Sequence, residues 1–504
     1  MDKQNVVIIG SGLGGLVCGA ILAREGYSVC ILERNKQIGG TLQTYARNKI
    51  IFDSGVHYVG GLGKGQNLNR LFTFLGIMDK VNIRQMDVDM VDGVMFRGDP
   101  KIYRYAQGYD RFIQNMVEDF PDEEIAIRKY CDRIKAVCER FPMYNLRMGS
   151  YLEQEGMLDI DVQTFIESIT SNKKLQHVLM GTNLLYAGVP YKTPFYVHAL
   201  IINSYIESSW RFVDGGSQIA RLLAREITTR GGIIKRHVHI TRLVEENGML
   251  QFAESSSGER FYGNLFISNV HPAKTIEMTE SSLIKKVFRN RMKNLENSIS
   301  MFYVSIVLKK NKIEYRNSNL YCYGEENPWC IIEYTPENWP NGFALFYSAS
   351  SKTQVYAEGI TLMGYMRYEE VKKWEKTFNT VTEESGRGEE YENFKKEKAE
   401  KLFAFAEQWV PGLKEAIEQY YVATPLTLRD YVGTNDGSLY GFVKDYRDPM
   451  RTFISTRTKI PNLFLTGQNI NLHGVLGVTV SAVITCSEIL GREYILNKIE
   501  HAQA

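Results

Sequence analysis

The first forty residues alternate between short apolar runs and glycine turns. Residues 6–9 read Val-Val-Ile-Ile and lead directly into the run Gly10-Ser-Gly-Leu-Gly-Gly15, and a second apolar run, 29–32, ends on Glu33. This order predicts a strand, a tight turn, a helix and a parallel strand. In such a unit the glycines let the backbone and the helix N-terminus approach a pyrophosphate, and the acid accepts hydrogen bonds from a ribose. The N-terminal unit therefore predicts a dinucleotide site.

The residues after Glu33 indicate which dinucleotide is bound. Arg34 comes directly after the acid, and the pair Gly39-Gly40 comes just past the second strand. A Gly-Gly pair there suits a second close approach of the backbone to a long cofactor, an extension commoner in FAD-binding chains than in NAD dehydrogenases. We predict that FAD contacts this unit through Gly10, Gly12, Leu13, Gly14, Gly15, Glu33, Arg34, Gly39, Gly40 and Thr41.

A similar pattern recurs near the C-terminus. The run 462–466 predicts a strand, and it is followed by a glycine turn and an apolar helix that extends to residue 490. The positive end of a helix dipole stabilises negative charge, so this segment is expected to face the pyrimidine end of a flavin ring. A predicted strand around residue 238 is expected to lie near the adenine. These two segments add the cofactor contacts Gly467, Gln468, Gly477, Val478 and Val238.

The composition indicates which kinds of binding partner and which cellular compartment are expected for this chain. The formal net charge is only +2 over 504 residues, so no global field favours nucleic acid. The seven cysteines are odd in number and scattered, which argues against a metal site or a disulfide framework and favours a reducing compartment. No apolar run reaches the length of a membrane span. We expect a cytoplasmic protein, and leave peripheral docking of the basic segment 283–293 on a membrane as an alternative to an ordinary surface helix.

Helical and strand-like segments occur in blocks along the chain. Between residues 66 and 190 apolar residues recur at helical spacing, as in Phe112, Met116 and Phe120, and no strand-like alternation interrupts them. Residues 210–270 return to strands and a helix. Further strand-like runs occupy residues 301–308, 330–334 and 343–347.

These blocks predict an α/β fold with two interleaved domains. One is an FAD-binding Rossmann-like domain of the glutathione reductase type, and the other is a substrate domain made of a mixed sheet and a helical insertion. The predicted boundaries are 1–65, 205–295 and 441–504 for the FAD-binding domain, and 66–204 and 296–440 for the substrate domain.

Three stretches carry a resemblance to a known superfamily. They are Phe52-Asp-Ser-Gly-Val-His-Tyr-Val-Gly60, Thr424-Pro-Leu-Thr427 with Tyr440-Gly441, and Leu465-Thr-Gly-Gln-Asn-Ile470 with Cys486-Ser-Glu-Ile-Leu490. Together with the glycine motifs they resemble the phytoene desaturase, carotenoid isomerase and retinol saturase superfamily of flavoproteins, and most of all the retinol saturases. The likeness is looser through the helical middle. It implies bound FAD and a long apolar isoprenoid substrate, either a retinoid or a carotenoid.

Saturation of a carbon–carbon double bond needs a hydride equivalent for one carbon and a proton for the other. Reduced flavin supplies the first in a dry pocket, and the second needs a donor. His57, Tyr58 and Tyr440 are the candidate catalytic residues for proton donation, although each also has a structural interpretation. Asp53 is expected to hold the turn at Gly55 through backbone N–H groups.

The source of electrons and the direction of the reaction stay open at this point. The sequence has no second G-x-G-x-x-G unit that would seat NADPH permanently, so NAD(P)H that docks transiently, a separate reductase and a quinone are all candidates. We favour saturation over desaturation and isomerisation. Two alternatives share the nucleotide fold: a flavin amine oxidase, which would need an aromatic cage facing the flavin, and a non-catalytic flavin-binding lipid carrier.

Overall fold

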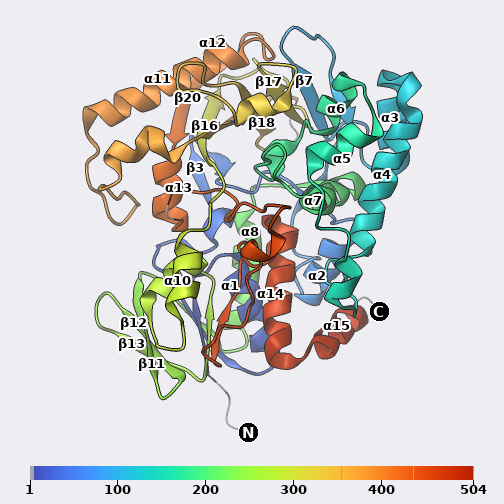
Figure 1. The fold of residues 1–504 in the computed structure, drawn as a ribbon. Coiled ribbons are helices and arrows are strands. Elements are labelled where there is room, and N and C mark those ends of the chain that lie inside the picture. Colours follow the sequence, from blue (N-terminus) through green and yellow to red (C-terminus); the bar gives the residue numbers. More distant parts are fainter. Residues whose placement is uncertain (1–4, 353–354, 435, 503–504) are drawn as a thin grey trace.

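The fold is described from a computed structural model, which describes residues 5–352, 355–434 and 436–502. Two large sheets organise the chain, one in the upper half and one in the lower half of Figure 1. The two ends of the chain both lie in the lower half. The predicted α/β fold is confirmed: a Rossmann-like nucleotide domain is interleaved with a mixed sheet and helices.

The lower sheet is parallel, and its five strands follow the order β10-β2-β1-β14-β21. One face packs on three helices, because Val6 and Ile8 of β1 belong to the same buried cluster as α1, α8 and α14. The other face packs on a small sheet, since Val7 and Ile9 contact its residues. The elements are β1 (Asn5–Ile9), β2 (Ser28–Leu32), β10 (Ile233–Lys235), β14 (Leu265–Ser268), β21 (Leu463–Leu465), α1 (Leu13–Arg24), α8 (Ser217–Thr228) and α14 (Gly474–Leu490).

The upper sheet is mixed and has the strand order β20-β16-β19-β18-β17-β7-β8. Every residue of β16, β17, β18 and β19 is buried, which explains why these strands are mostly apolar rather than alternating. The strands are β7 (Asp92–Phe96), β8 (Tyr103–Tyr105), β16 (Ser300–Leu308), β17 (Asn319–Tyr323), β18 (Gly342–Tyr347), β19 (Gly359–Met366) and β20 (Ile417–Ala423).

The remaining strands among the described residues form three smaller sheets. The order β13-β12-β11-β15 forms the sheet that covers the parallel one, β3 pairs with β4, and β5-β9-β6 links the two halves. Their bounds are β3 (Thr44–Arg47), β4 (Ile50–Asp53), β5 (Val59–Gly60), β6 (Ile83–Gln85), β9 (Ser209–Phe212), β11 (Ile240–Glu246), β12 (Met249–Ser255), β13 (Arg260–Tyr262) and β15 (Thr279–Glu280).

The remaining helices surround the two sheets (Figure 1). The α-helices are α2 (Asn67–Phe74), α3 (Tyr109–Asp119), α4 (Glu124–Glu139), α5 (Val162–Ile169), α6 (Lys173–Leu179), α7 (Phe195–Glu207), α9 (Pro272–Met278), α10 (Lys286–Lys293), α11 (Gly388–Ala406), α12 (Leu413–Ala416), α13 (Pro425–Val432) and α15 (Arg492–His501). The 3₁₀ turns are η1 (Gly40–Leu42), η2 (Pro121–Glu123), η3 (Tyr151–Gln154), η4 (Asn183–Leu185), η5 (Pro328–Ile331), η6 (Tyr368–Trp374) and η7 (Pro449–Thr452).

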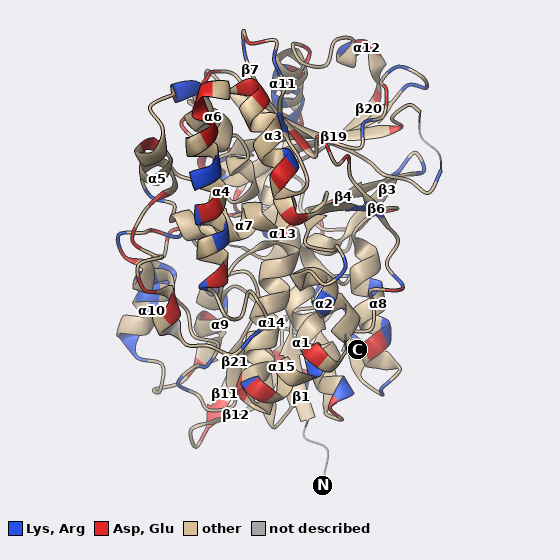
Figure 2. Ribbon diagram, turned by 90° about the vertical axis from the view of Figure 1, so that its right-hand side faces the viewer, with Lys and Arg blue, Asp and Glu red and all other residues tan. Residues whose placement is uncertain are grey.

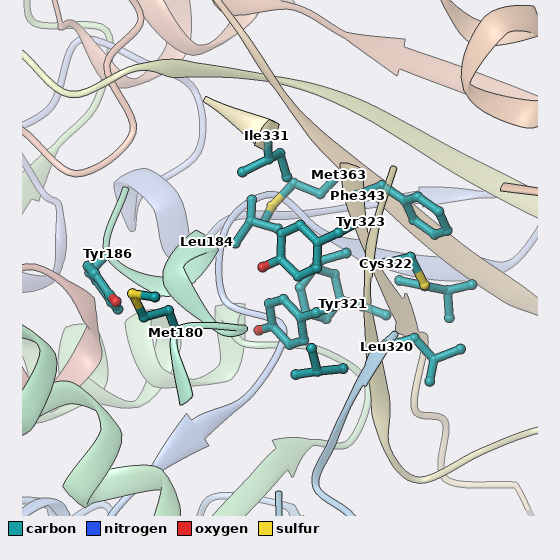
Figure 3. Close-up of a cluster of buried hydrophobic side chains, with 14 of the residues drawn as sticks. Met180, Leu184, Tyr186, Leu320, Tyr321, Cys322, Tyr323, Ile331, Phe343 and Met363 are labelled. Carbon is teal, nitrogen blue, oxygen red and sulfur yellow. The ribbon is translucent and has the colours of Figure 1, made fainter. Parts of the chain in front are cut away.

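The largest hydrophobic core lies between the upper sheet and helices α4 to α7. In Figure 3, Tyr321 and Tyr323 of β17 point toward Leu184, whereas Leu320 and Cys322 point to the opposite face of the sheet. Because both faces of this strand are covered, aromatic side chains fill one side and aliphatic ones the other. The seven-stranded sheet is therefore a rigid wall against which a binding site can be built.

Three local predictions were wrong. The segment 66–190 is not free of strands, because it contains β6, β7 and β8, and β7 pairs in parallel with β17. Residues 330–334 form no strand, because Pro328 starts the 3₁₀ turn η5 there. Val238 lies between β10 and β11 rather than within a strand. In each case a short apolar run took its conformation from a distant partner or a nearby proline.

The strands of the two large sheets are distributed over the chain in the same alternating order as the predicted domains. Those of the parallel sheet come from residues 5–32, 233–268 and 463–465, and those of the mixed sheet come from 92–105 and 300–423. We propose the division into 1–65, 205–295 and 441–504 against 66–204 and 296–440 on this basis.

Charges of both signs alternate over the surface, as they do along α4 in Figure 2. None of the described helices is long and apolar enough to cross a membrane. In the basic helix α10, Arg289 donates hydrogen bonds to the carbonyls of Ile276 and Thr279, and Arg291 donates one to the carbonyl of Phe453. Two of its cations thus serve the fold, and membrane docking of this helix stays a prediction.

Candidate functional site

Two glycine turns meet above the parallel sheet and line one cavity of about 560 Å³. The cavity lies at the carboxyl ends of β1, β2, β14 and β21, which is where open α/β sheets bind ligands. Twelve of the predicted cofactor contacts line it, namely Gly10, Gly12, Leu13, Gly14, Glu33, Arg34, Gly40, Thr41, Val238, Gly467, Gln468 and Val478.

Three predicted contacts lie outside this wall and shape the backbone around it. A Cβ on Gly15 would lie 2.2 Å from the carbonyl oxygen of Gly10, so only glycine lets α1 rest on the turn. Gly39 has φ +110° and forms a bridge with Gly12. Gly477 lies in the first turn of α14 and faces a second cavity. These glycines permit close backbone contacts, and their neighbours line the cavity.

The two glycine turns are in direct contact through Asn269. A Cβ on Gly14 would lie 3.1 Å from the backbone nitrogen of Gly467 and 2.6 Å from the Asn269 Oδ1 atom. A Cβ on Gly12 would lie 2.6 Å from the Asn269 Nδ2 atom. Asn269 was missed as a candidate, although its place at the carboxyl end of a buried strand was a usable signal.

Glu33 is held by the N-terminal unit itself. Its carboxylate accepts hydrogen bonds from the backbone nitrogen and hydroxyl of Ser11, at 3.0 and 2.5 Å, and from the backbone nitrogen of Asn35 at 2.8 Å. Two carboxylate oxygens offer about four acceptor positions, so one position is left for a hydroxyl in the cavity. The acid is therefore oriented as a ribose diol requires.

Basic side chains gather at the Glu33 end of the cavity. Arg34 donates a hydrogen bond to the carbonyl of Asp430. Burial and the nearby Arg34 charge lower the pKa of Lys274 and the pKa of His239, and both residues line the cavity. The repulsion between Arg34 and Lys274 would be reduced by an anionic ligand between them. Lys274 and His239 had no recognisable motif in the sequence.

Polar atoms without protein partners point to a polar ligand in the same cavity. The Nδ1 atom of His271 and the hydroxyl of Thr434 are buried and have no hydrogen-bond partner within the described ranges. Buried polar atoms are normally paired, because leaving one unpaired costs about 1–3 kcal/mol. The glycine cradle, the oriented acid and these two atoms together fit a flavin dinucleotide.

A second cavity, of about 760 Å³, adjoins the first. Most of its wall is apolar or aromatic, including Leu200, Ile201, Tyr205, Tyr303, Phe346, Met363 and Leu472. Five residues line both cavities, namely Gly55, Val56, Tyr440, Gly474 and Val475. Molecules bound in the two cavities would therefore touch at this shared wall.

His57 lies in the wall of the second cavity and is neutral at physiological pH. Its ring stacks on Phe346 with ring centres 4.3 Å apart, and its Nε2 atom has no hydrogen-bond partner in the part of the chain that the structure describes. Burial lowers the pKa of His57 to about 3. An imidazole that holds no extra proton is a weak acid, which limits His57 as a proton donor.

Tyr58 lines the second cavity, and its hydroxyl belongs to a buried polar network. Its hydroxyl donates to Asp92 Oδ2 at 2.9 Å and lies 2.7 Å from the Tyr321 hydroxyl. Asp92 also accepts a hydrogen bond from Asn319. Burial raises the pKa of Asp92 to about 6 and raises the pKa of Tyr58 well above its ordinary value. The Tyr58 proton is thus donated to a carboxylate within the network.

Tyr440 is the one of the three candidates that lines both cavities. Its ring stacks on His473 at 4.1 Å, and its hydroxyl donates to the Leu184 carbonyl at 3.1 Å. Burial raises the pKa of Tyr440 well above its ordinary value, so the phenol keeps its proton. This geometry places a protonated hydroxyl beside the shared wall.

The predicted hydrogen-bond partner of Asp53, the backbone of the Gly55 turn, was wrong. Its Oδ1 atom accepts a hydrogen bond of 2.8 Å from the backbone nitrogen of Gly216, and no bond to the Gly55 turn is seen in the described residues. The reason is tertiary, because Gly216 at the start of α8 is brought next to β4 by the fold. Burial raises the pKa of Asp53 from 3.8 to about 7, although the Gly216 bond acts in the opposite direction.

We expect Asp53→Asn to flatten the pH dependence of stability. Because the folded pKa exceeds the unfolded one, the native state binds a proton more tightly, and stability falls as pH rises from about 4 to 7. Asparagine keeps the acceptor for Gly216 and removes the charge. The variant should melt a few degrees higher than wild type at pH 8 and about equally at pH 4.

Scanning calorimetry at both pH values checks this expectation. Asp79→Asn is the matched control, because Asp79 is exposed. If the melting temperature of Asp53→Asn stays below that of wild type by the same amount at pH 4 and pH 8, the proposed charge effect is absent.

Comparison with known proteins agrees with the geometry. The NAD(P)-binding Rossmann-like domain family matches residues 8–75. The all-trans-retinol 13,14-reductase of Rattus norvegicus is 26% identical, over 97% of this chain and 86% of the relative. The chloroplastic prolycopene isomerase 2 of an Oncidium hybrid cultivar is 22% identical, over 97% of this chain and 84% of the relative. An engineered putrescine oxidase has the same fold, with a TM-score of 0.64 at 12% identity, covering 97% of this chain and 99% of the other.

The full-length relatives and the flavin-sized cavity point to one conclusion. The likeness to putrescine oxidase concerns the fold alone, since its identity is so low. The resemblance seen in the sequence is confirmed. The chain is an oxidoreductase that is similar, over nearly its whole length, to all-trans-retinol 13,14-reductases and prolycopene isomerases.

Proposed function

We propose that this chain is an FAD-dependent oxidoreductase that acts on a carbon–carbon double bond of an apolar polyene, a retinoid or a carotenoid, with saturation as its direction. One observation carries the proposal: an apolar cavity of about 760 Å³ meets the nucleotide cavity at Val56, Tyr440 and Val475. Relatives named as a retinol reductase and a prolycopene isomerase support the same substrate class.

FAD is the flavin that suits both glycine turns. The N-terminal turn and α1 would hold a pyrophosphate, and Glu33 would hold a ribose. The N-terminal end of α14 lies across the cavity, where its dipole would face the ring. A ligand that spans both ends needs a flavin ring and a nucleotide in one molecule.

The cofactor and the residues near the shared wall would have separate roles in the reaction. When bound, reduced FAD would supply the hydride equivalent for one carbon of the double bond. The apolar wall would exclude water and hold the polyene in place. Tyr440 would donate the proton, because of the three candidate donors only it lines both cavities, and its hydroxyl is bonded to the Leu184 carbonyl rather than to a carboxylate. NAD(P)H or a separate redox protein would dock transiently and reduce the flavin again after each turnover.

Anaerobic reduction of a polyene tests the proposal. When the purified flavoprotein is fully reduced and mixed with all-trans-retinol or a carotenoid, the polyene absorption is expected to shift to shorter wavelength while the oxidised flavin spectrum returns. Mass spectrometry should then find a product heavier by two hydrogens. The same protein in its oxidised form, mixed with the same polyene, is the control.

Two other results would contradict saturation. Rapid bleaching of the oxidised flavin by putrescine, with every polyene unchanged, would favour an amine oxidase. A lipid carrier would be favoured if polyenes do not reoxidise the reduced flavin and amines do not reduce the oxidised flavin.

A further inference from the structure

A lysine without a counter-charge lies in the wall of the apolar cavity. The Lys444 side chain lines it together with Thr452, Asn471 and His473. Its ammonium group donates one hydrogen bond, of 3.0 Å, to the Thr452 carbonyl. An ammonium group has three donors, so two are left for a molecule in the cavity.

The acids around Lys444 are paired with other cations. Asp445, its neighbour in sequence, is held by Arg447. Glu296 pairs with Lys192, and Glu488 in the same cavity pairs with Arg457. Across the described ranges Lys444 itself forms no ion pair with a carboxylate. Lys444 is partly buried, and a charge withdrawn from water normally has a partner, because desolvating it alone is costly.

We propose that Lys444 binds the carboxylate of a lipid whose apolar chain lies in the large cavity. A carboxylate would neutralise the ammonium group and accept its two free N–H donors, which a neutral hydroxyl or ester does only in part. The apolar wall formed by residues such as Leu200 and Met363 suits the rest of such a molecule. Burial lowers the pKa of Lys444 to about 8, so most of the population is still cationic at neutral pH and ready for an anion.

The position of Lys444 also decides which end of the lipid lies near the cofactor. His473 contacts the ring of Tyr440 at 4.1 Å, and the Lys444 charge contributes to lowering the pKa of His473. Lys444 is therefore close to the shared wall of the two cavities. A carboxylate held there places the double bond nearest the polar end beside Tyr440. This orientation rests on the proposed function, whereas the binding of the carboxylate does not.

Direct binding tests the proposal without any turnover. The oxidised holoprotein is titrated with all-trans-retinoic acid, its methyl ester and all-trans-retinol, and the change in flavin fluorescence gives each affinity. Wild type should bind the acid at least about tenfold more tightly than the ester. Lys444→Met should lose that preference while its affinity for retinol stays within about twofold. Lys444→Arg keeps the positive charge and should therefore retain the preference for the acid over the ester.

Arg492→Met is the matched control. Arg492 also lines the cavity as an unpaired cation within the described ranges, but it donates to the Gly149 carbonyl and lies at the start of α15. Its removal should leave the preference for the acid intact. An unchanged preference in Lys444→Met, or none in wild type, would overturn the proposal. If retinol is not reduced but Lys444-dependent binding of the acid persists, the proposed reaction is wrong and the carboxylate site stands.

Discussion

The Gly15→Ala variant is expected to purify without flavin. A Cβ at this position would lie 2.2 Å from the carbonyl oxygen of Gly10, which is a backbone atom and cannot move away as a flexible side chain could. The turn and the first residues of α1 must then separate, which moves the backbone N–H groups that would face the pyrophosphate. Overpacking of this kind costs about 3 kcal/mol, which corresponds to a loss of flavin affinity of about 100-fold.

The flavin content of the purified variant, measured from its absorbance after denaturation, checks this expectation. Gly386→Ala is the control, because a Cβ there meets no atom within 4 Å and the residue has no positive φ. Circular dichroism shows whether the variant has kept its fold. A folded Gly15→Ala protein with a full complement of flavin would contradict the role given to this turn.

The Arg211→Met variant is expected to be strongly destabilised. Arg211 is only 1% exposed and donates hydrogen bonds to the carbonyls of Tyr347 and Ser318 and to Asn319 Oδ1, at 2.8, 2.9 and 2.7 Å. It thereby joins β9 to the seven-stranded sheet. Its charge also helps to offset the buried Asp92 carboxylate. Removing one partner of a buried charged network costs about 3–5 kcal/mol.

Thermal unfolding of the holoprotein measures this loss. Arg236→Met is the matched control because Arg236 is exposed, and its melting temperature should stay within about 1 °C of wild type. Adding Asp92→Asn to Arg211→Met should recover part of the loss, since it removes the carboxylate left without a cation. Equal melting temperatures for Arg211→Met and Arg236→Met would show that the network contributes little.

Patterns within a few neighbouring residues were predicted well from the sequence. The turn from Gly10 to Gly15 and the C-terminal turn at Gly467 form as expected, because tight turns and close backbone contacts are local needs that only glycine meets. Strand assignment was weaker. Residues 92–96 form β7 between two partners, the nearby β8 and β17, which lies more than two hundred residues later.

The candidate catalytic residues illustrate the same limit. His57, Tyr58 and Tyr440 were all predicted, and all three line the large cavity. Their chemical differences came from distant partners, because Asp92 takes the Tyr58 hydroxyl and Phe346 covers the His57 ring. No pattern in the chain records such pairs, since they join residues from separate strands.

By itself the sequence determined that a strand, a glycine turn and a helix occur at each end of the chain, and with them the nucleotide-binding type of fold. The tertiary structure alone decided that Asn269 lies between the two turns, that an apolar cavity shares a wall with the nucleotide cavity, and that Lys444 is left without a counter-charge. The physical reason is the separation along the chain of the residues that interact. Backbone conformation depends on neighbouring residues, whereas burial and charge pairing depend on residues that only the folded chain brings together.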